Sequence, residues 1–147
     1  MQRHSVVVRI FVCAAMSCAF SAASAKDFKG PVEASVLKVL DGDTFLAEAH
    51  IWPGHWVRVN VRIRGIDTPE MRSRCVSERD AALQAQVALS EFLGEQKISI
   101  SNIGGAKYHG RVLADVETGD GLQVAAAMIE SQFARAYSGG KRKSWCD

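Results

Sequence analysis

Hydrophobic and polar residues alternate most regularly between residues 56 and 66. The apolar positions of this segment are Val57, Val59, Val61 and Ile63, and the polar positions that follow each of them are Arg58, Asn60, Arg62 and Arg64. A period of two is typical of a β-strand that turns one face to the core and the other to solvent. The segment therefore predicts a strand from whose polar face three arginines project together.

The rest of the chain predicts four more strands and two helices. We expect the further strands at 32–40, 44–51, 97–101 and 111–116. Apolar residues recur at three- and four-residue spacing over 77–93, which predicts a helix with Ser77 as its N-cap. A second helix is expected over 122–132, a glycine-rich loop over 102–106, and no helix after Ser138.

The order of these elements indicates the fold class. Three strands, a helix, two strands and a final helix make an α+β arrangement, which suits a five-stranded OB-type Greek-key β-barrel with two or three helices. The length suits one domain, which we expect to span 26–147. Trp52 and Trp56 lie near the turn between the second and third strands, and we expect them to close one end of the barrel, or else to stack on bases.

The first 25 residues have the features of a signal peptide. Two arginines supply positive charge, the run 6–20 is mainly apolar, and Ala23-Ser24-Ala25 fits the small-residue cleavage rule. The run is too short and too weakly apolar to favour a permanent membrane helix. The residues before Cys18 fit the alternative of a lipoprotein poorly. We therefore expect an exported protein, periplasmic or secreted, with no stable membrane anchor.

Removal of this leader changes the charge balance. It takes 25 of the 147 residues, including two arginines, so Lys+Arg falls from 18 to 16 and equals the 16 Asp+Glu. A near-neutral chain of 122 residues is not a strongly basic nucleic-acid coat, and any binding of polyanions must come from local basic clusters. The basic run 141–143 is expected to be a solvated surface segment. We expect a monomer.

Two cysteines remain after the leader is removed. Cys75 and Cys146 are an even pair in a chain expected to be exported, which predicts one disulfide. The bond would close a loop of about 70 residues and would stabilise the fold by roughly 4 kcal/mol in the chain-entropy model. The alternatives are two free thiols or a bridge between chains.

The candidate chemistry lies in the middle of the chain. Asp67 and Glu70 are three positions apart at the end of a predicted strand, the turn 41–43 adds two aspartates, and Arg62 and Arg111 flank the segment. Carboxylates bind hard cations such as Ca²⁺ or Mg²⁺, which screen and polarise a phosphate. Arginines bind the non-bridging phosphate oxygens in bidentate fashion. Together these residue types indicate hydrolysis of a phosphodiester.

Three segments that carry these residues resemble the thermonuclease family, the staphylococcal-nuclease-like calcium-dependent nucleases. The matching segments are 39–44 (VLDGDT), 62–70 (RIRGIDTPE) and 107–114 (KYHGRVLA), within a resemblance that runs from Val32 to Tyr137. The resemblance implies an OB-type barrel and hydrolysis of DNA and RNA with little sequence preference, leaving the phosphate on the 3′ side of the product.

The resemblance also implies how a metal would be bound. Asp43 and Asp67 would be the carboxylate ligands of calcium, Thr68 would add its backbone carbonyl, and Asp41 would shape the site from behind these ligands. Calcium takes six to eight oxygen ligands, so water and substrate could complete the shell. Mg²⁺ or Mn²⁺ would also accept such oxygen ligands.

The remaining matched residues would act on the substrate. Glu70 would orient and deprotonate the attacking water, and Arg62 and Arg111 would hold the phosphate and stabilise the transition state. Tyr108 would contact the substrate. His109, however, interrupts the Tyr-Gly-Arg sequence that the family usually has, so either ring could stack on it.

Two other classes of function compete with this interpretation. One is a non-catalytic OB-fold envelope module that binds nucleic acid or glycans, and the other is a structural part of an envelope assembly. A decayed site would have lost one of its essential residues, yet all five are present: Asp43, Arg62, Asp67, Glu70 and Arg111. The sequence therefore favours a metal-dependent nuclease.

Overall fold

A computed structural model describes residues 27–106 and 110–146. The predicted signal peptide, together with Tyr108 and His109, lies outside the described residues. Neither helix of the described part is long and apolar enough to cross a membrane.

Five strands close into one barrel, in the order β1-β2-β3-β6-β5. Their bounds are β1 Val32–Val39, β2 Thr44–Trp52, β3 His55–Ile63, β5 Lys97–Gly105 and β6 Arg111–Thr118. Neighbouring strands pair antiparallel, except that β3 and β6 run parallel. This architecture confirms the predicted α+β fold with an OB-type barrel.

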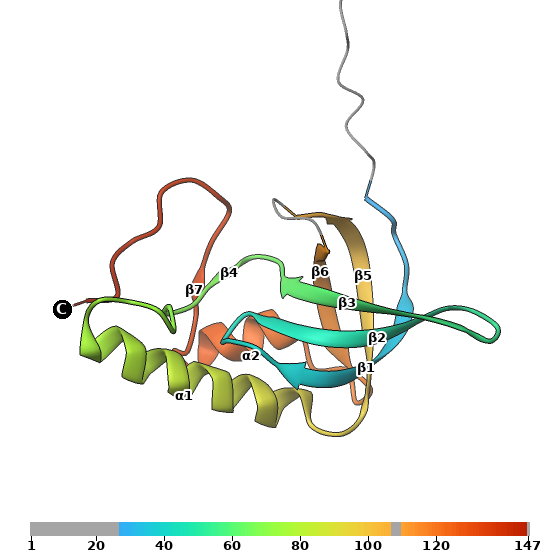
Figure 1. The fold of residues 1–147 in the computed structure, drawn as a ribbon, viewed down its shortest axis with the longest axis horizontal. Coiled ribbons are helices and arrows are strands. Elements are labelled where there is room, and N and C mark those ends of the chain that lie inside the picture. The colour runs from blue at the N-terminus through green and yellow to red at the C-terminus, as the bar shows by residue number, and fades with distance from the viewer. Residues whose placement is uncertain (1–26, 107–109, 147) are drawn as a thin grey trace, which may run out of the picture.

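Two helices cover the barrel on one side. Helix α1 (Val76–Leu93) and helix α2 (Val124–Glu130) contact each other, and Figure 1 shows both to the left of the barrel, with α1 along the lower edge. Their apolar residues and the inward faces of the strands form one core, whose largest fully buried side chains include Phe45, Ile63, Leu89 and Met128. Burial of this apolar surface holds α1 against α2 and β1.

A small second sheet lies between the barrel and the chain end. β4 (Ile66–Asp67) pairs antiparallel with β7 (Arg135–Ala136), so Asp67 faces Arg135 in the ladder. β7 was not predictable from the sequence, because two residues show no recognisable periodicity. After β7 the C-terminal tail, residues 138–146, forms an arch that returns to the start of α1 (Figure 1).

Several predicted boundaries were wrong. Helix α1 begins at Val76, with Cys75 rather than Ser77 at the N-cap and no side-chain cap bond. β5 continues to Gly105, through the expected loop, because a bulge after Ser101 and a positive φ of 48° at Asn102 let the ladder resume.

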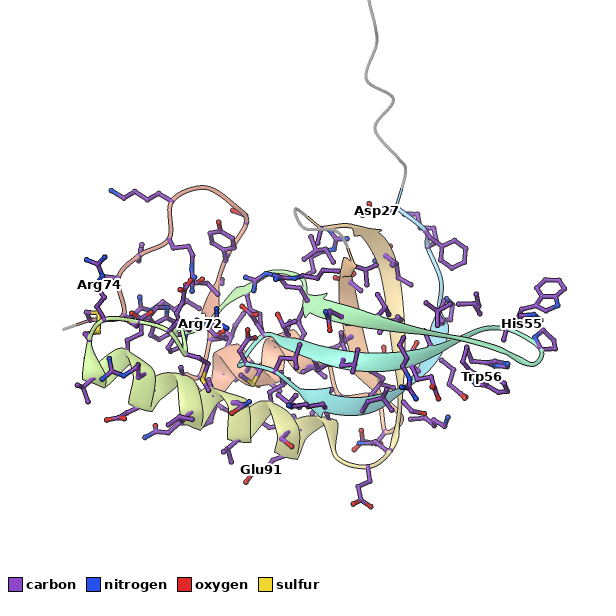
Figure 2. The ribbon with its side chains drawn as sticks, viewed as in Figure 1. Asp27, His55, Trp56, Arg72, Arg74 and Glu91 are labelled. Atoms are coloured by element: carbon purple, nitrogen blue, oxygen red, sulfur yellow. A yellow bond between two sulfur atoms is a disulfide. The ribbon has the colours of Figure 1, made fainter. Side chains whose placement is uncertain are left out.

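The prediction that the hairpin tryptophans close the barrel was also wrong. Trp52 and Trp56 are 69% and 57% exposed, because the β2–β3 hairpin extends beyond the barrel. Figure 2 shows His55 and Trp56 at the end of this hairpin, and the Trp56 ring stacks on His50 at a centroid distance of 5.3 Å.

Candidate active site

A cleft of about 1230 Å³ lies where β2 begins and β3 ends. Six of the residues predicted for the site line it: Asp41, Asp43, Arg62, Thr68, Glu70 and Arg111. Asp67 is buried next to them, and Arg142, its ion-pair partner, lines the cleft. Segments that are far apart in the sequence therefore converge on one concave surface, which has room for an ion and a phosphodiester.

The turn 41–43 is held tightly against the segment that follows β4. The backbone N–H of Asp43 donates to Asp41 Oδ1 at 3.2 Å, and the Asp43 carbonyl accepts from the Ile63 N–H at 2.8 Å. A Cβ atom on Gly42 would lie 2.7 Å from the Ala85 Cβ and 3.0 Å from the Thr68 Cβ. The close approach explains why glycine stands between the two aspartates.

The two aspartates of this turn influence each other. Burial of Asp41, and then the negative charge of Asp43 beside it, raise the pKa of Asp41 to about 6. Two neighbouring carboxylates in a half-buried turn repel each other, and a bound cation would relieve that repulsion. The turn is therefore electrostatically suited to a cation.

Arg62 reaches into the cleft from the end of β3. Its guanidinium forms an ion pair with the Asp43 carboxylate and donates to the Ile66 carbonyl at 3.3 Å. The Asp43 side chain is only 5% exposed, and its Oδ1 also accepts from the Thr44 hydroxyl at 2.8 Å. Asp43 therefore orients Arg62, while the guanidinium offsets the charge of the buried carboxylate.

The other two arginines of the alternating segment have different surroundings. Arg58 forms an exposed ion pair with Glu48, and Arg64 donates to Asp27 and to the Asn102 and Leu113 carbonyls. The expectation that the three arginines project as one group was therefore wrong: the twist of β3 and the turn after Ile63 separate them. Arg64 lines the cleft but is tied to its wall.

Glu70 stands at the edge of the cleft with its side chain 57% exposed. Its backbone N–H donates to Glu78 Oε1 at 3.1 Å, and the Ser73 hydroxyl donates to the other oxygen of Glu78. The Ser73 hydrogen bond, which outweighs the opposing effect of burial, holds the pKa of Glu78 below its ordinary value. Glu78 thus fixes the loop that presents Glu70.

Arg111 approaches the cleft from the other side, at the first position of β6. Parallel pairing with β3 sets its register, with Arg111 opposite Asn60. The predicted substrate contact Tyr108 precedes it but lies outside the described residues. The structure instead places another aromatic residue, Tyr137, in the wall of the cleft, where its hydroxyl donates to the Gly140 carbonyl at 2.7 Å.

The C-terminal tail contributes two residues to the site that were not predicted from the sequence, Arg142 and Trp145. Arg142 forms ion pairs with Asp67 and Glu70 and donates to the Thr68 carbonyl. Trp145 Nε1 donates to Asp67 Oδ2 at 3.0 Å. The expectation that residues 141–143 form only a solvated surface was therefore wrong for Arg142, whereas Lys141 and Lys143 are exposed.

The electrostatics of Arg142 reflect these contacts. Burial of the guanidinium would lower its pKa, but the hydrogen bond and charge of Asp67, followed by the charges of Glu70 and Asp43, raise the pKa of Arg142 overall. Asp67 Oδ1 and Arg142 Nε are buried, and in the described part of the chain they have no hydrogen-bond partner beyond their ion pair. Asp67 and Glu70 thus share the positive charge of Arg142, while Asp43 pairs with Arg62.

The predicted disulfide anchors this tail. Cys75 and Cys146 are bonded, with an S–S distance of 2.00 Å. Glu78 lies beside both sulfurs, but bonded sulfurs are not thiolates, so this group is not a metal site of the zinc type. A clue to Arg142 was present in the sequence, since a Cys75–Cys146 bond brings the basic run close to Glu70.

The cleft therefore combines oxygen ligands, an exposed carboxylate and several guanidinium groups on a rigid barrel. Asp43, Asp67 and the Thr68 carbonyl are all hard oxygen donors, the type that Ca²⁺ and Mg²⁺ prefer. No protein-family model and no curated protein matches this chain.

Proposed function

We propose that this protein is a metal-dependent nuclease of the thermonuclease type, which hydrolyses the phosphodiester bonds of DNA and RNA. The observation that carries the proposal is that Asp43, Arg62, Thr68, Glu70 and Arg111 line one cleft, with Asp67 against it. Each side chain has the chemistry that this reaction needs, and their meeting on one surface supports a shared role.

A divalent cation, with calcium the first choice, fits the donor atoms. Asp43 and Asp67 would supply carboxylate oxygens and Thr68 its carbonyl, and two of these three groups already attract the guanidinium of Arg142. When bound, the cation would screen the charge of the phosphate and polarise it. Asp41, behind Asp43, would tune the charge of the turn.

The protein side chains would perform the remaining steps. Glu70 is exposed toward the cleft and would orient a water molecule and accept its proton. Arg62 and Arg111 would bind the non-bridging oxygens and stabilise the charge that develops in the transition state. Arg62 is pre-oriented by Asp43, which reduces the cost of ordering it when the substrate binds.

The shape of the cleft suits a nucleic-acid backbone more than a base. Its polar side chains are chiefly arginines and carboxylates, and its volume is open to solvent. Contacts to phosphate position a nucleic acid but carry no sequence information. We therefore infer cleavage of both DNA and RNA with little sequence preference, at sites where the backbone can bend into the cleft.

One observation favours the second candidate function, a non-catalytic nucleic-acid-binding module. Arg142 contacts Asp67, Thr68 and Glu70, the groups that a metal and the attacking water would need. In that case the cleft would bind phosphate through its arginines but would not cleave it. Binding without turnover, at any calcium concentration, would identify this function.

A digestion assay separates the two functions. The oxidised protein is incubated with single- and double-stranded DNA and RNA, first with calcium and then with a calcium chelator. We expect calcium-dependent cleavage that Glu70→Gln reduces by about two or more orders of magnitude. Glu91→Gln removes a carboxylate from the exposed side of α1 (Figure 2) and should cleave like the parent. If Glu70→Gln also cleaves at the parent rate, Glu70 is not the base.

A further inference from the structure

The C-terminal tail covers the part of the cleft that the proposed function assigns to the cation. Between β7 and the disulfide the chain runs from Tyr137, whose N–H donates to the Gly65 carbonyl at 2.8 Å, to Cys146. Arg142 lies midway along this span and contacts the cleft. The tail, which Figure 1 shows as an arch, is thus attached at both ends. The guanidinium that binds the cleft lies between these two attachments.

The groups that Arg142 contacts are the ones that a cation and the attacking water would use. Its guanidinium holds the Asp67 carboxylate and the Thr68 carbonyl, the proposed cation ligands, and it also holds Glu70, the proposed base. Trp145 binds the second oxygen of Asp67. A divalent cation and this guanidinium carry charge of the same sign and need the same lone pairs, so both cannot occupy these oxygens at once.

The tail is built so that it can leave the cleft without unfolding the barrel. Gly139 and Gly140 have φ values of 104° and 91°, which glycine adopts without strain, and residues 138–141 are exposed. Arg142 is 34% exposed at its side chain, so water can reach its contacts. No residue of the tail belongs to the hydrophobic core of the described chain.

Contacts at the far end of the tail keep Arg142 in place. The disulfide joins Cys146 to Cys75 at the start of α1, and Arg135 lies over the Trp145 ring at 3.6 Å while donating to the Ser144 carbonyl at 2.9 Å. A group tethered at both ends has an effective concentration on the order of millimolar or above at its binding site. Calcium would have to overcome this local concentration.

We propose that Arg142 is an internal competitor for the cation site, and that the Cys75–Cys146 disulfide controls its strength. The inference rests on the proposed function and adds its regulation. With the disulfide closed, the guanidinium occupies two of the three proposed cation ligands, Asp67 and the Thr68 carbonyl, and the site is held at low cation affinity. A small dithiol reductant would transfer two electrons and two protons to the S–S bond, giving two thiols and the oxidised dithiol. The tail would then be attached only at β7, so the effective concentration of the Arg142 guanidinium at the cleft would fall.

Calcium binding measured by calorimetry tests the competition without relying on activity. We expect Arg142→Gln to bind calcium about tenfold more tightly than the oxidised parent, because the competitor is gone. Lys141→Gln removes the same charge from the neighbouring exposed residue and should leave the affinity within about twofold. In the double variant Asp67→Asn/Arg142→Gln the gain should disappear, which locates the effect at the shared carboxylate.

The outcomes separate this inference from the proposed function. Equal or weaker calcium binding by Arg142→Gln, with intact nuclease activity, overturns the competition and leaves the function standing. Tighter binding without cleavage of any nucleic acid supports the competition and overturns the function. Absence of calcium binding in the parent and in Arg142→Gln overturns both. Circular dichroism of each variant confirms that the barrel is folded.

Reduction tests the control by the disulfide. A dithiol should raise the calcium affinity of the parent about threefold or more, since one tether of the competitor is lost, and it should leave Arg142→Gln unchanged. The double variant Cys75→Ser/Cys146→Ser should behave like the reduced parent, which excludes an effect of the reductant on calcium. An equal response of the parent and Arg142→Gln to reduction would show that the disulfide acts elsewhere.

Discussion

At the scale of single residues, the ion pair between Arg62 and Asp43 should matter both for the stability of the fold and for the proposed catalysis. Asp43 is 5% exposed at its side chain, so removal of the guanidinium leaves a buried charge without its partner. The same guanidinium would meet the phosphate, and its loss would therefore affect folding and turnover together. The ion pair between Arg58, on the same strand, and Glu48 is open to solvent.

This difference makes Arg62→Ala and Arg58→Ala a matched pair. We expect Arg62→Ala to lower the free energy of unfolding by about 3 kcal/mol and to reduce kcat more than it weakens substrate binding, because a phosphate clamp acts most on the transition state. Arg58→Ala should change the free energy of unfolding by less than about 1 kcal/mol. Urea unfolding and steady-state kinetics measure both effects, and equal losses in the two variants would contradict the assignment.

Gly42 lies where there is no room for a side chain. A methyl group at this position would meet the Ala85 Cβ at 2.7 Å and the Thr68 Cβ at 3.0 Å. Gly42→Ala should therefore cost about 1–3 kcal/mol and push the turn away from Thr68, which weakens calcium binding. Gly105→Ala is the comparison for stability, since nothing lies within 4 Å of a Cβ there and its φ is not positive. Unchanged stability and calcium affinity in Gly42→Ala would show that the turn can shift freely.

At the scale of elements, the first turn of α1 organises the loop that carries Glu70. Glu78 accepts hydrogen bonds from the Glu70 N–H and from the Ser73 hydroxyl. Since Cys75 provides no side-chain cap, Glu78 is the acidic group that favours the positive start of this helix. One carboxylate therefore connects the helix to the proposed base.

The lowered pKa of Glu78 has a consequence for stability. The ionised carboxylate stabilises the fold above its ordinary pKa of 4.5, and this contribution is lost as the pH falls through the lower value in the folded protein. Allowing for solvent screening, we expect Glu78→Gln to cost about 0.5–1 kcal/mol at pH 7. In chemical unfolding the gap between parent and variant should close below pH 4.5; a gap independent of pH would exclude the carboxylate charge as its cause.

The elements also show what the sequence could and could not predict. The alternation at Val57–Ile63 and the helical spacing over 77–93 gave the right element types, because each segment buries one continuous face. β7 was not predictable, since its pairing with β4 depends on α2 bringing residues 135–136 back to the barrel. The prediction that the hairpin tryptophans close the barrel was wrong because periodicity does not indicate how far a pair of strands extends past the core.

At the scale of the whole molecule, the predicted site residues converge because the barrel closes. Asp43 immediately precedes β2, Arg62 is the last residue but one of β3, and Arg111 is the first residue of β6, so the order of the strands brings them to one cleft. The residue types could be chosen from the sequence alone. The predicted Cys75–Cys146 bond, across 71 positions, places the basic run near Glu70, but no motif or periodicity indicates that Arg142 is the residue of this run that enters the cleft.

The same bond should contribute to global stability. Its span of 71 positions corresponds to about 4 kcal/mol in the chain-entropy model. We expect Cys75→Ser/Cys146→Ser to lower the free energy of unfolding by up to this amount, measured by denaturant titration without reductant. Cys146→Ser alone should show a similar loss, since either change prevents the bond. A loss well below 1 kcal/mol would show that the unfolded chain is not restricted by it.

The backbone hydrogen bonds at the end of β3 have a consequence for local opening. The Ile63 N–H donates to the Asp43 carbonyl and the Arg64 N–H to the Ala114 carbonyl, each at 2.8 Å, so three strands are tied at the edge of the cleft. Their amide protons should exchange with deuterium only through global unfolding, whereas those of residues 139–143 should exchange within seconds. The wall of the cleft at the end of β3 would then stay closed in the folded protein, whereas the wall formed by residues 139–143 would open locally. Substrate would enter past residues 139–143.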